Sequence, residues 1–158
     1  MSSTRTGVKV QAVIYRCGKW PEFLILHRNK EHGDFWQNVT GNVEPGEDLG
    51  RALLREIREE TGIGSDCIMH IAHRIMAFRF RAHEMDFIEY VYAIRVRDSC
   101  PIDISNNVDR EHDAYEWVSM DRAVRTMRWY TNADAVRIAN LIASAVCSKA
   151  SDHADKKN

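Results

Sequence analysis

One short segment constrains the fold of this chain more than any other feature. It runs from Gly41 to Ile63 and reads G-N-V-E-P-G-E-D-L-G-R-A-L-L-R-E-I-R-E-E-T-G-I. Plotted at about 100° per residue, the part after the Pro-Gly turn forms a helix with an apolar, an acidic and a basic stripe. The apolar stripe packs against a core, so we expect the acidic stripe beside it at the rim of a cleft.

The acidic stripe contains Glu56, Glu59 and Glu60 within about one helical turn, next to Arg55. Carboxylates this close repel one another unless a cation lies among them. A hard, oxygen-liganded cation suits an all-carboxylate face, so we expect Mg²⁺, with Mn²⁺ as a substitute. The simpler alternative is a solvated helix face, which is what a run of charges usually represents.

The composition is that of one soluble domain without a strong global charge. The 158 residues include 22 Lys and Arg against 23 Asp and Glu, so no net field attracts nucleic acid or an anionic membrane. No apolar run approaches the roughly 20 residues of a membrane span, and residues 1–7 lack the apolar stretch of a signal peptide. We therefore expect a cytoplasmic protein with no membrane contact and no specific nucleic-acid binding.

The cysteines and histidines form no metal-binding pattern. Cys17, Cys67, Cys100 and Cys147 are scattered, without a C-x-x-C pair. We expect free thiols in a reducing cytosol, with a structural disulfide as the alternative. The seven histidines show neither H-x-x-x-H nor H-x-E spacing, and we expect none of them to bind metal.

The rest of the pattern predicts one α/β domain over residues 8–147, between flexible tails at residues 1–7 and 148–158. A polar loop is expected over residues 98–110, and Ser119 or Asp121 can cap a brief helix. Short runs rich in β-branched and aromatic residues predict strands at 8–15, 23–26, 35–40, 68–80, 85–96 and 114–118.

A last helix is expected after residues 131–134, which have the form of a helix N-cap. The apolar residues that follow recur with the spacing of one helix face. This predicted face consists of Ile138, Leu141, Ile142, Ala145 and Val146.

The segment 41–63 resembles the Nudix box, G-x5-E-x7-R-E-U-x-E-E-x-G-U, at every specified position. Residues 35–41 and the run Glu111-His112-Asp113-Ala114-Tyr115 are similar to the bacterial dihydroneopterin triphosphate and dATP pyrophosphohydrolase subgroup. The resemblance implies a Nudix α/β/α sandwich, with a mixed β-sheet between helices. The matching positions are Gly41, Glu47, Arg55, Glu56, Ile57, Glu59, Glu60, Gly62 and Ile63.

The resemblance also implies a reaction, the hydrolysis of a nucleoside diphosphate linked to another group by metal-assisted attack of water on phosphorus. Glu59 and Glu111 are both candidates for the general base, and Arg55 is expected to orient Glu59. The implied metal-binding residues are Glu56, Glu60, Glu59, Glu111, the carbonyl of Thr40 and, through water, Glu47.

For the substrate, the resemblance implies contacts from Arg28, Thr40, Thr131 and Arg5. We expect a small-molecule triphosphate, of the dATP or dihydroneopterin triphosphate type, which is cleaved to the monophosphate and pyrophosphate by a monomer or homodimer. Residues 79–89 form a shorter segment than in the pterin enzymes. The alternatives are damaged nucleotides, dinucleoside polyphosphates, or a nucleotide-sensing module without turnover. Phenylalanines at 78 and 80, where dinucleoside polyphosphate hydrolases carry a tyrosine, favour the triphosphate.

Overall fold

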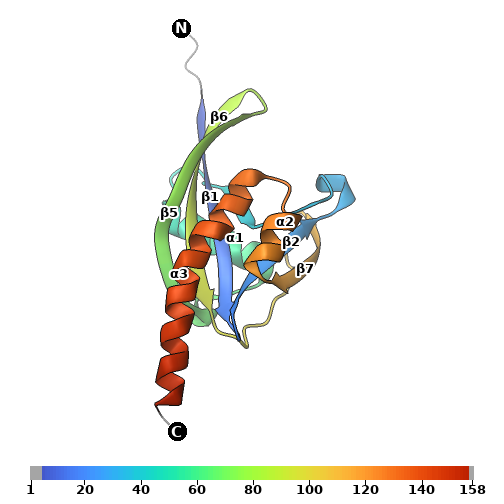
Figure 1. Ribbon diagram of the computed structural model, residues 1–158. Coiled ribbons are helices and arrows are strands. Elements are labelled where there is room, and N and C mark those ends of the chain that lie inside the picture. The colour runs from blue at the N-terminus through green and yellow to red at the C-terminus, as the bar shows by residue number, and fades with distance from the viewer. Residues whose placement is uncertain (1–4, 157–158) are drawn as a thin grey trace.

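The computed structural model describes residues 5–156 and contains one seven-stranded sheet flanked by helices (Figure 1). The strands are β1 (Thr6–Cys17), β2 (Pro21–Arg28), β3 (Phe35–Gln37), β4 (Val39–Asn42), β5 (Ile68–Ala82), β6 (Met85–Val96) and β7 (His112–Val118). The α-helices are α1 (Leu49–Thr61), α2 (Met120–Thr126) and α3 (Tyr130–Asp155), and short 3-10 turns lie at Lys30–His32 and Ser65–Cys67.

Strand β1 is the centre of the sheet. It runs parallel to β6 on one side. On the other side it pairs antiparallel with β4 near its start and with β2 near its end. Strand β2 also pairs with β3 and β7, and β5 pairs with β6. The expected mixed sheet is therefore confirmed. The strand predicted at residues 35–40 is divided at Asn38 into β3 and β4.

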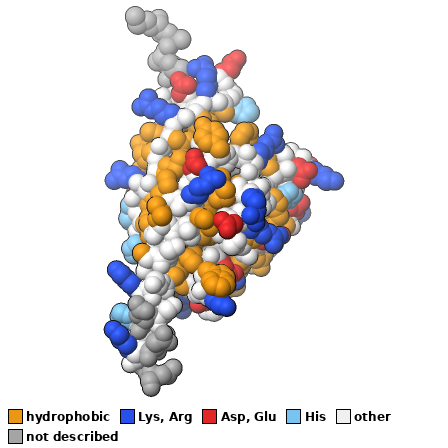
Figure 2. Space-filling model, in the orientation of Figure 1, with side chains coloured by type: hydrophobic (Ala, Val, Ile, Leu, Met, Phe, Trp, Pro, Cys, Tyr) orange, Lys and Arg blue, Asp and Glu red, His pale blue; other side chains and the backbone are white. Residues whose placement is uncertain are grey.

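The two faces of the sheet are covered by different helices. Leu53 and Ile57 of α1 pack against one face, in a core that includes Val10 and Ile14 of β1. Helices α2 and α3 cover the opposite face, where Val136 joins the second core. The α/β/α sandwich is thus confirmed, and Figure 1 shows α3 crossing the sheet. On the face shown in Figure 2, basic side chains are scattered among acidic and hydrophobic ones.

Helix α1 has well-defined ends. The side chain of Asp48 accepts a hydrogen bond from the backbone amide of Arg51 at 2.8 Å and caps the start. Gly62 ends the helix in the left-handed conformation, with φ of 72°, and its amide donates to the Arg58 carbonyl. These local signals are the reason that the helix could be predicted from the sequence.

The buried face of α3 differs from the predicted one. Leu141 was expected in the core but is 73% exposed, and Ala145 is also exposed. Small side chains at intervals of four residues occupy the buried face instead, and they allow the helix to lie close to the sheet. Together with Val136, this face includes Ala135, Ala139, Ala143 and Cys147.

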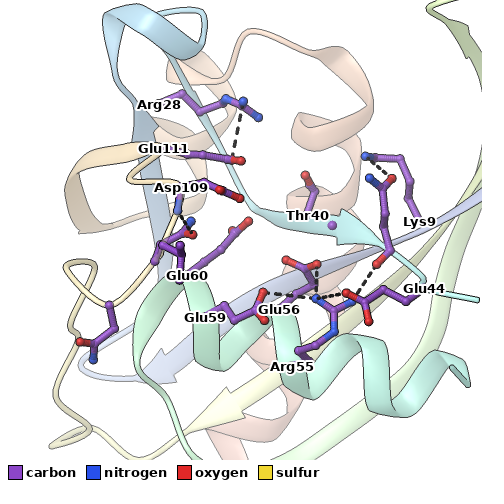
Figure 3. Close-up of a pocket in the computed structure, with 15 residues that line it drawn as sticks. Lys9, Arg28, Thr40, Glu44, Arg55, Glu56, Glu59, Glu60, Asp109 and Glu111 are labelled. Atoms are coloured by element: carbon purple, nitrogen blue, oxygen red, sulfur yellow. Dashed lines mark hydrogen bonds and ion pairs between the residues drawn. The ribbon is translucent and has the colours of Figure 1, made fainter.

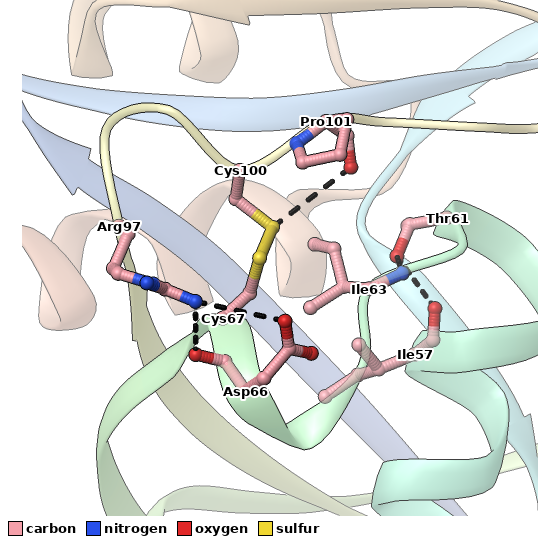
Figure 4. Close-up of a disulfide and its surroundings, with 8 residues drawn as sticks. All are labelled: Ile57, Thr61, Ile63, Asp66, Cys67, Arg97, Cys100 and Pro101. Carbon is pink, nitrogen blue, oxygen red and sulfur yellow. Dashed lines mark hydrogen bonds and ion pairs between the residues drawn. A yellow bond between two sulfur atoms is a disulfide. The ribbon is translucent and has the colours of Figure 1, made fainter.

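All four cysteines form disulfides, so the expectation of free thiols is wrong. Cys17 at the end of β1 is joined to Cys147 of α3, across 130 residues of sequence. Cys67 is joined to Cys100, across 33 residues (Figure 4). The fold brings each pair together from distant segments, and sequence spacing carries no information about such pairing.

Both ends of the domain extend beyond the predicted limits. Strand β1 begins at Thr6, and α3 continues to Asp155, well past residue 147. The flexibility of the two tails stays a prediction. None of the helices in residues 5–156 combines the length and the apolarity that a membrane span requires.

Candidate active site

A cleft of about 620 Å³ lies beside the acidic stripe of α1 (Figure 3). Its walls come from β1, β2, β4, α1 and the loop between β6 and β7, so it is assembled from segments that are far apart in sequence. The charged residues that line it are Lys9, Arg28, Glu44, Arg55, Glu56, Glu59, Glu60, Asp109 and Glu111, together with the neutral residues Thr40, Gly41, Asn42, Asn106, Asn107 and Val108.

Gly41 allows the carboxylate of Glu56 to approach strand β4. A Cβ atom at position 41 would overlap with the carboxyl group of Glu56. Any side chain here would push Glu56 away from the cleft. The backbone φ of Gly41 is not in the left-handed region, so glycine is required here by packing against Glu56 and not by backbone conformation.

Arg55 holds several acceptors of the box in place. Its guanidinium donates two hydrogen bonds to Glu47, at 2.8 and 2.9 Å, and one to Glu56 at 2.8 Å. It also donates to Glu59 at 3.2 Å and to the carbonyl of Asn42 at 2.9 Å. The hydrogen bonds from Arg55 lower the pKa of Glu47 to about 2, so Glu47 stays ionised. Arg55 therefore fixes the positions of these carboxylates, and it binds both carboxylate oxygens of Glu47.

Glu60 is the most unusual carboxyl group of the cleft. Its residue is 4% exposed, and its Oε2 has no hydrogen-bond partner. Burial raises its pKa well above the usual range, and the charges of Glu56 and Glu111 raise it further. Arg28 and the backbone amide of Thr40 oppose this shift. A buried carboxylate oxygen without a partner, beside two other carboxylates, fits a hard divalent cation.

Glu111 reaches Glu60 because the end of β2 holds it. The backbone amide of Asn29 donates to the Glu111 carbonyl at 2.9 Å, and the Asn29 side chain donates to the carbonyl of Arg110 at 2.7 Å. The carboxylate of Glu111 forms an ion pair with Arg28, at 3.6 Å. These contacts connect the distant acid to the box, although 51 residues separate it from Glu60.

His112 lies beside the acidic cluster, although none of the histidines was expected to bind metal. Ligand atoms of Glu60, Glu111 and His112 lie within 4.8 Å of one another. Burial lowers the pKa of His112 to about 4, and the charge of Arg28 adds to the shift, so the ring is neutral near pH 7. Its Nδ1 has no partner, and its Nε2 lies 3.3 Å from the amide nitrogen of Gln37. A neutral imidazole is a metal-ligand type, which the H-x-x-x-H and H-x-E spacings could not reveal.

The structure brings most of the predicted site residues together. Glu47, Thr131 and Arg5 are the exceptions, because none of them lines this cleft: Glu47 faces Arg55, Thr131 lies in the first turn of α3, and Arg5 precedes β1. Lys9 and the loop residues 106–109 also line the cleft, and no sequence pattern indicated them. The predicted residues that line the cleft are Arg28, Thr40, Arg55, Glu56, Glu59, Glu60 and Glu111.

A family model described as the NUDIX domain matches residues 5–139, which is most of the chain. The chain belongs to the Nudix family. Nudix hydrolases act on pyrophosphate bonds of nucleotide-type substrates and generally use divalent metal ions. The acidic cluster around Glu60 is where this Nudix protein offers ligands for such ions.

Curated relatives of this Nudix protein have different names. A Myxococcus xanthus protein named octanoyltransferase is 31% identical over 124 residues, which are 77% of this chain and 34% of that protein. The chain therefore spans about a third of that relative. The asymmetrical bis(5'-nucleosyl)-tetraphosphatase of Sus scrofa is 33% identical over 65% of this chain and 67% of that protein. Dihydroneopterin triphosphate diphosphatase of Escherichia coli is 26% identical, over 82% of this chain and 89% of that protein.

Two solved structures resemble the Nudix fold described above. The structure of E. coli dihydroneopterin triphosphate pyrophosphohydrolase has a TM-score of 0.69 and 26% identity, and the match covers 82% of this chain and 91% of that one. An Ap4A hydrolase from C. elegans has a TM-score of 0.74 and 21% identity, with coverage of 86% and 96%. At this identity, the second likeness shows the fold alone.

The carboxyl group of Glu60 makes the stability of the metal-free protein depend on pH. The pKa of Glu60 is raised on folding from the usual 4.5. The contribution of this group to the free energy of unfolding is therefore complete below about pH 4.5, and it is lost as the pH rises through the pKa of the folded protein. We expect the Tm in EDTA to fall over this range, and Mg²⁺ to raise Tm more at about pH 8 than at about pH 5. Calorimetry of E60Q is the control, because glutamine cannot titrate. An identical slope in E60Q would contradict this prediction.

Proposed function

We propose that this Nudix protein hydrolyses a nucleoside or pterin triphosphate, of the dATP or dihydroneopterin triphosphate type, to the monophosphate and pyrophosphate. The observation that carries the proposal is the buried, unpartnered oxygen of Glu60 beside Glu56 and Glu111, in a cleft that Arg28 also lines. The E. coli relatives with this substrate in their names support the pterin assignment. The phenylalanines at 78 and 80 support a single nucleoside over a dinucleotide.

Mg²⁺ is the cation that we propose for the acidic cluster. Glu56, Glu60 and Glu111 would hold it, because hard oxygen ligands suit Mg²⁺ and Mn²⁺. When bound, such an ion supplies Lewis-acid polarisation of a phosphate oxygen and lowers the pKa of a coordinated water. Arg55 keeps Glu56 in place for this role, through the hydrogen bond of 2.8 Å.

The protein's own groups then act on the water and on the phosphates. A new bond forms between the water oxygen and phosphorus, the bridging P–O bond breaks, and pyrophosphate leaves with the electron pair. Either Glu59 or Glu111 accepts the proton of the attacking water. Arg28 binds the phosphate chain at its end of the cleft. Comparison of E59Q with E111Q identifies the base, since only the base variant loses the acidic limb of the pH–rate profile.

The test is a panel of substrates with the purified protein and Mg²⁺. We expect dATP or dihydroneopterin triphosphate to have the highest kcat/KM, with a monophosphate and pyrophosphate as products detected by chromatography. Oxidised triphosphates belong in the same panel, because a preference for them would indicate removal of damaged nucleotides. Absence of turnover with tight nucleotide binding would support a sensing module and overturn the proposal.

A second candidate substrate is a dinucleoside tetraphosphate. The Sus scrofa relative with 33% identity carries this substrate in its name and favours it. Such a substrate would yield two nucleotides instead of pyrophosphate. Chromatography of the products from diadenosine tetraphosphate distinguishes the two candidates in one experiment.

We also propose that the protein acts in the cytoplasm, because its proposed substrates are nucleotides. Its proposed oligomeric state is a monomer or homodimer. The disulfides weigh against this location, since cytosolic reductants keep most thiols reduced. Alkylation of thiols in intact cells, followed by fractionation, decides the question. We expect the protein in the cytoplasmic fraction, with its four cysteines protected from alkylation by the two disulfides. Protein confined to an oxidising compartment would contradict the location.

A further inference from the structure

Three cationic side chains line the cleft, and two of them are already engaged. The guanidinium of Arg55 donates to three carboxylates and one carbonyl. Arg28 donates to the carbonyl of His32 at 2.9 Å and forms an ion pair with Glu111. The third cation is Lys9, which the sequence did not suggest as a cleft residue.

The charge of Lys9 is not paired with an acid. Its Nζ donates to the neutral Oδ1 of Asn42 at 3.1 Å and lies 5.6 Å from the ring centroid of Phe87. Within residues 5–156, no carboxylate lies close enough to form an ion pair with it. An ammonium group at a cleft rim, held by a neutral acceptor, can bind an anion without first breaking a salt bridge.

The sheet places this charge on the far side of the acidic group from Arg28. Lys9 is paired in register with Asn42 of β4 and Glu89 of β6. Its charge lowers the pKa of both Glu56 and Glu89, in opposition to the larger effect of burial. Figure 3 shows Lys9 and Arg28 on opposite sides of the cleft, with Glu56, Glu59 and Glu60 below them in this view.

We propose that Lys9 binds a phosphate group of the substrate at the end of the cleft remote from Arg28, and that it thereby selects long phosphate chains over short ones. This proposal rests on the proposed function. On this proposal a chain of three phosphates engages both Arg28 and Lys9, whereas a shorter chain engages only one of the two cations. Lys9 is therefore assigned as a specificity-determining residue for the triphosphate.

A purely structural role for Lys9 predicts a different result. If Lys9 only offset the charge of Glu56, its removal would change the acidic group and weaken the binding of all nucleotides to the same extent. Discrimination between chain lengths is thus the decisive readout, and it should be measured by binding as well as by turnover.

The experiment compares wild-type protein with K9M, K9R and K19M. Lys19 also lies over an aromatic ring, that of Trp20 at 4.7 Å, but does not line the cleft, so K19M is the matched control. Calorimetric titration with non-hydrolysable analogues of dATP and dADP, in the presence of Mg²⁺, measures Kd without turnover. KM and kcat for dATP are measured in parallel.

We expect K9M to raise Kd about tenfold for the triphosphate analogue and less than about twofold for the diphosphate analogue. For dATP, KM should rise and kcat should change little. K9R should restore most of the affinity, and K19M should match wild type. Equal weakening of both analogues, or no weakening, would overturn the assignment of Lys9. If wild type bound the triphosphate through Lys9 but did not hydrolyse it, the proposed function alone would fail.

Discussion

E60Q is expected to lower kcat for the best triphosphate on the order of 10³-fold. Without one charged ligand of the acidic group, the transition state loses several kcal/mol of Lewis-acid stabilisation. About 4 kcal/mol corresponds to a factor of roughly 10³ in rate. The same variant should be at least as stable as wild type without metal, because glutamine removes a buried charge that Glu56 and Glu111 repel. Steady-state kinetics and thermal unfolding in EDTA measure the two effects.

The matched control for E60Q is E116Q. Glu116 lies on β7, pairs with Arg122 at 2.7 Å and does not line the cleft. Its replacement should leave kcat within about twofold, because an exposed ion pair contributes at most about 1 kcal/mol, and that to stability alone. A loss of activity in E60Q accompanied by unfolding would mean that Glu60 is structural and not functional.

Removal of the disulfide between Cys17 and Cys147 is expected to have the largest effect on stability. In the chain-entropy model, cross-linking residues about 130 apart restricts the unfolded state by about 5 kcal/mol, and measured losses are commonly about 2–5 kcal/mol. The variant C17S/C147S should therefore unfold at a Tm lower by about 10 °C. Urea denaturation measures the free energy directly.

Reductant provides the control for the disulfide prediction. Dithiothreitol should destabilise wild type by more than it destabilises C17S/C147S, which retains only the bond between Cys67 and Cys100. Four thiols that react with a maleimide in the native, non-reduced protein would contradict both disulfides. The loss in C67S/C100S should be smaller, since the shorter loop of 33 residues restricts the unfolded chain less.

The sequence was most informative where the structure depends on local signals. Helix α1 carries its own cap, its terminal glycine and all of its charged stripes within one segment, so its position and its acidic face were predictable. The location of Glu111 in the cleft was expected from a resemblance, but its cause, the hydrogen bonds from Asn29, became visible only in the structure.

The errors concern contacts between distant segments. Lys9 reaches the cleft through the register of β1 against β4, which no pattern within β1 specifies. The disulfide between Cys17 and Cys147 depends on where the end of β1 meets α3, and not on cysteine spacing. The face of α3 was assigned from its largest apolar residues, whereas close packing on the sheet selects the small ones, such as Ala139 and Ala143.

The central claim is that the carboxylates gathered around Glu60 bind the divalent cation on which hydrolysis depends. Electron paramagnetic resonance of Mn²⁺, titrated with protein and a non-hydrolysable triphosphate, tests it most directly. We predict that wild-type protein depletes the signal of free Mn²⁺ and that E60Q at the same concentration leaves most of it. Equal depletion by both proteins, or none by either, would contradict the claim.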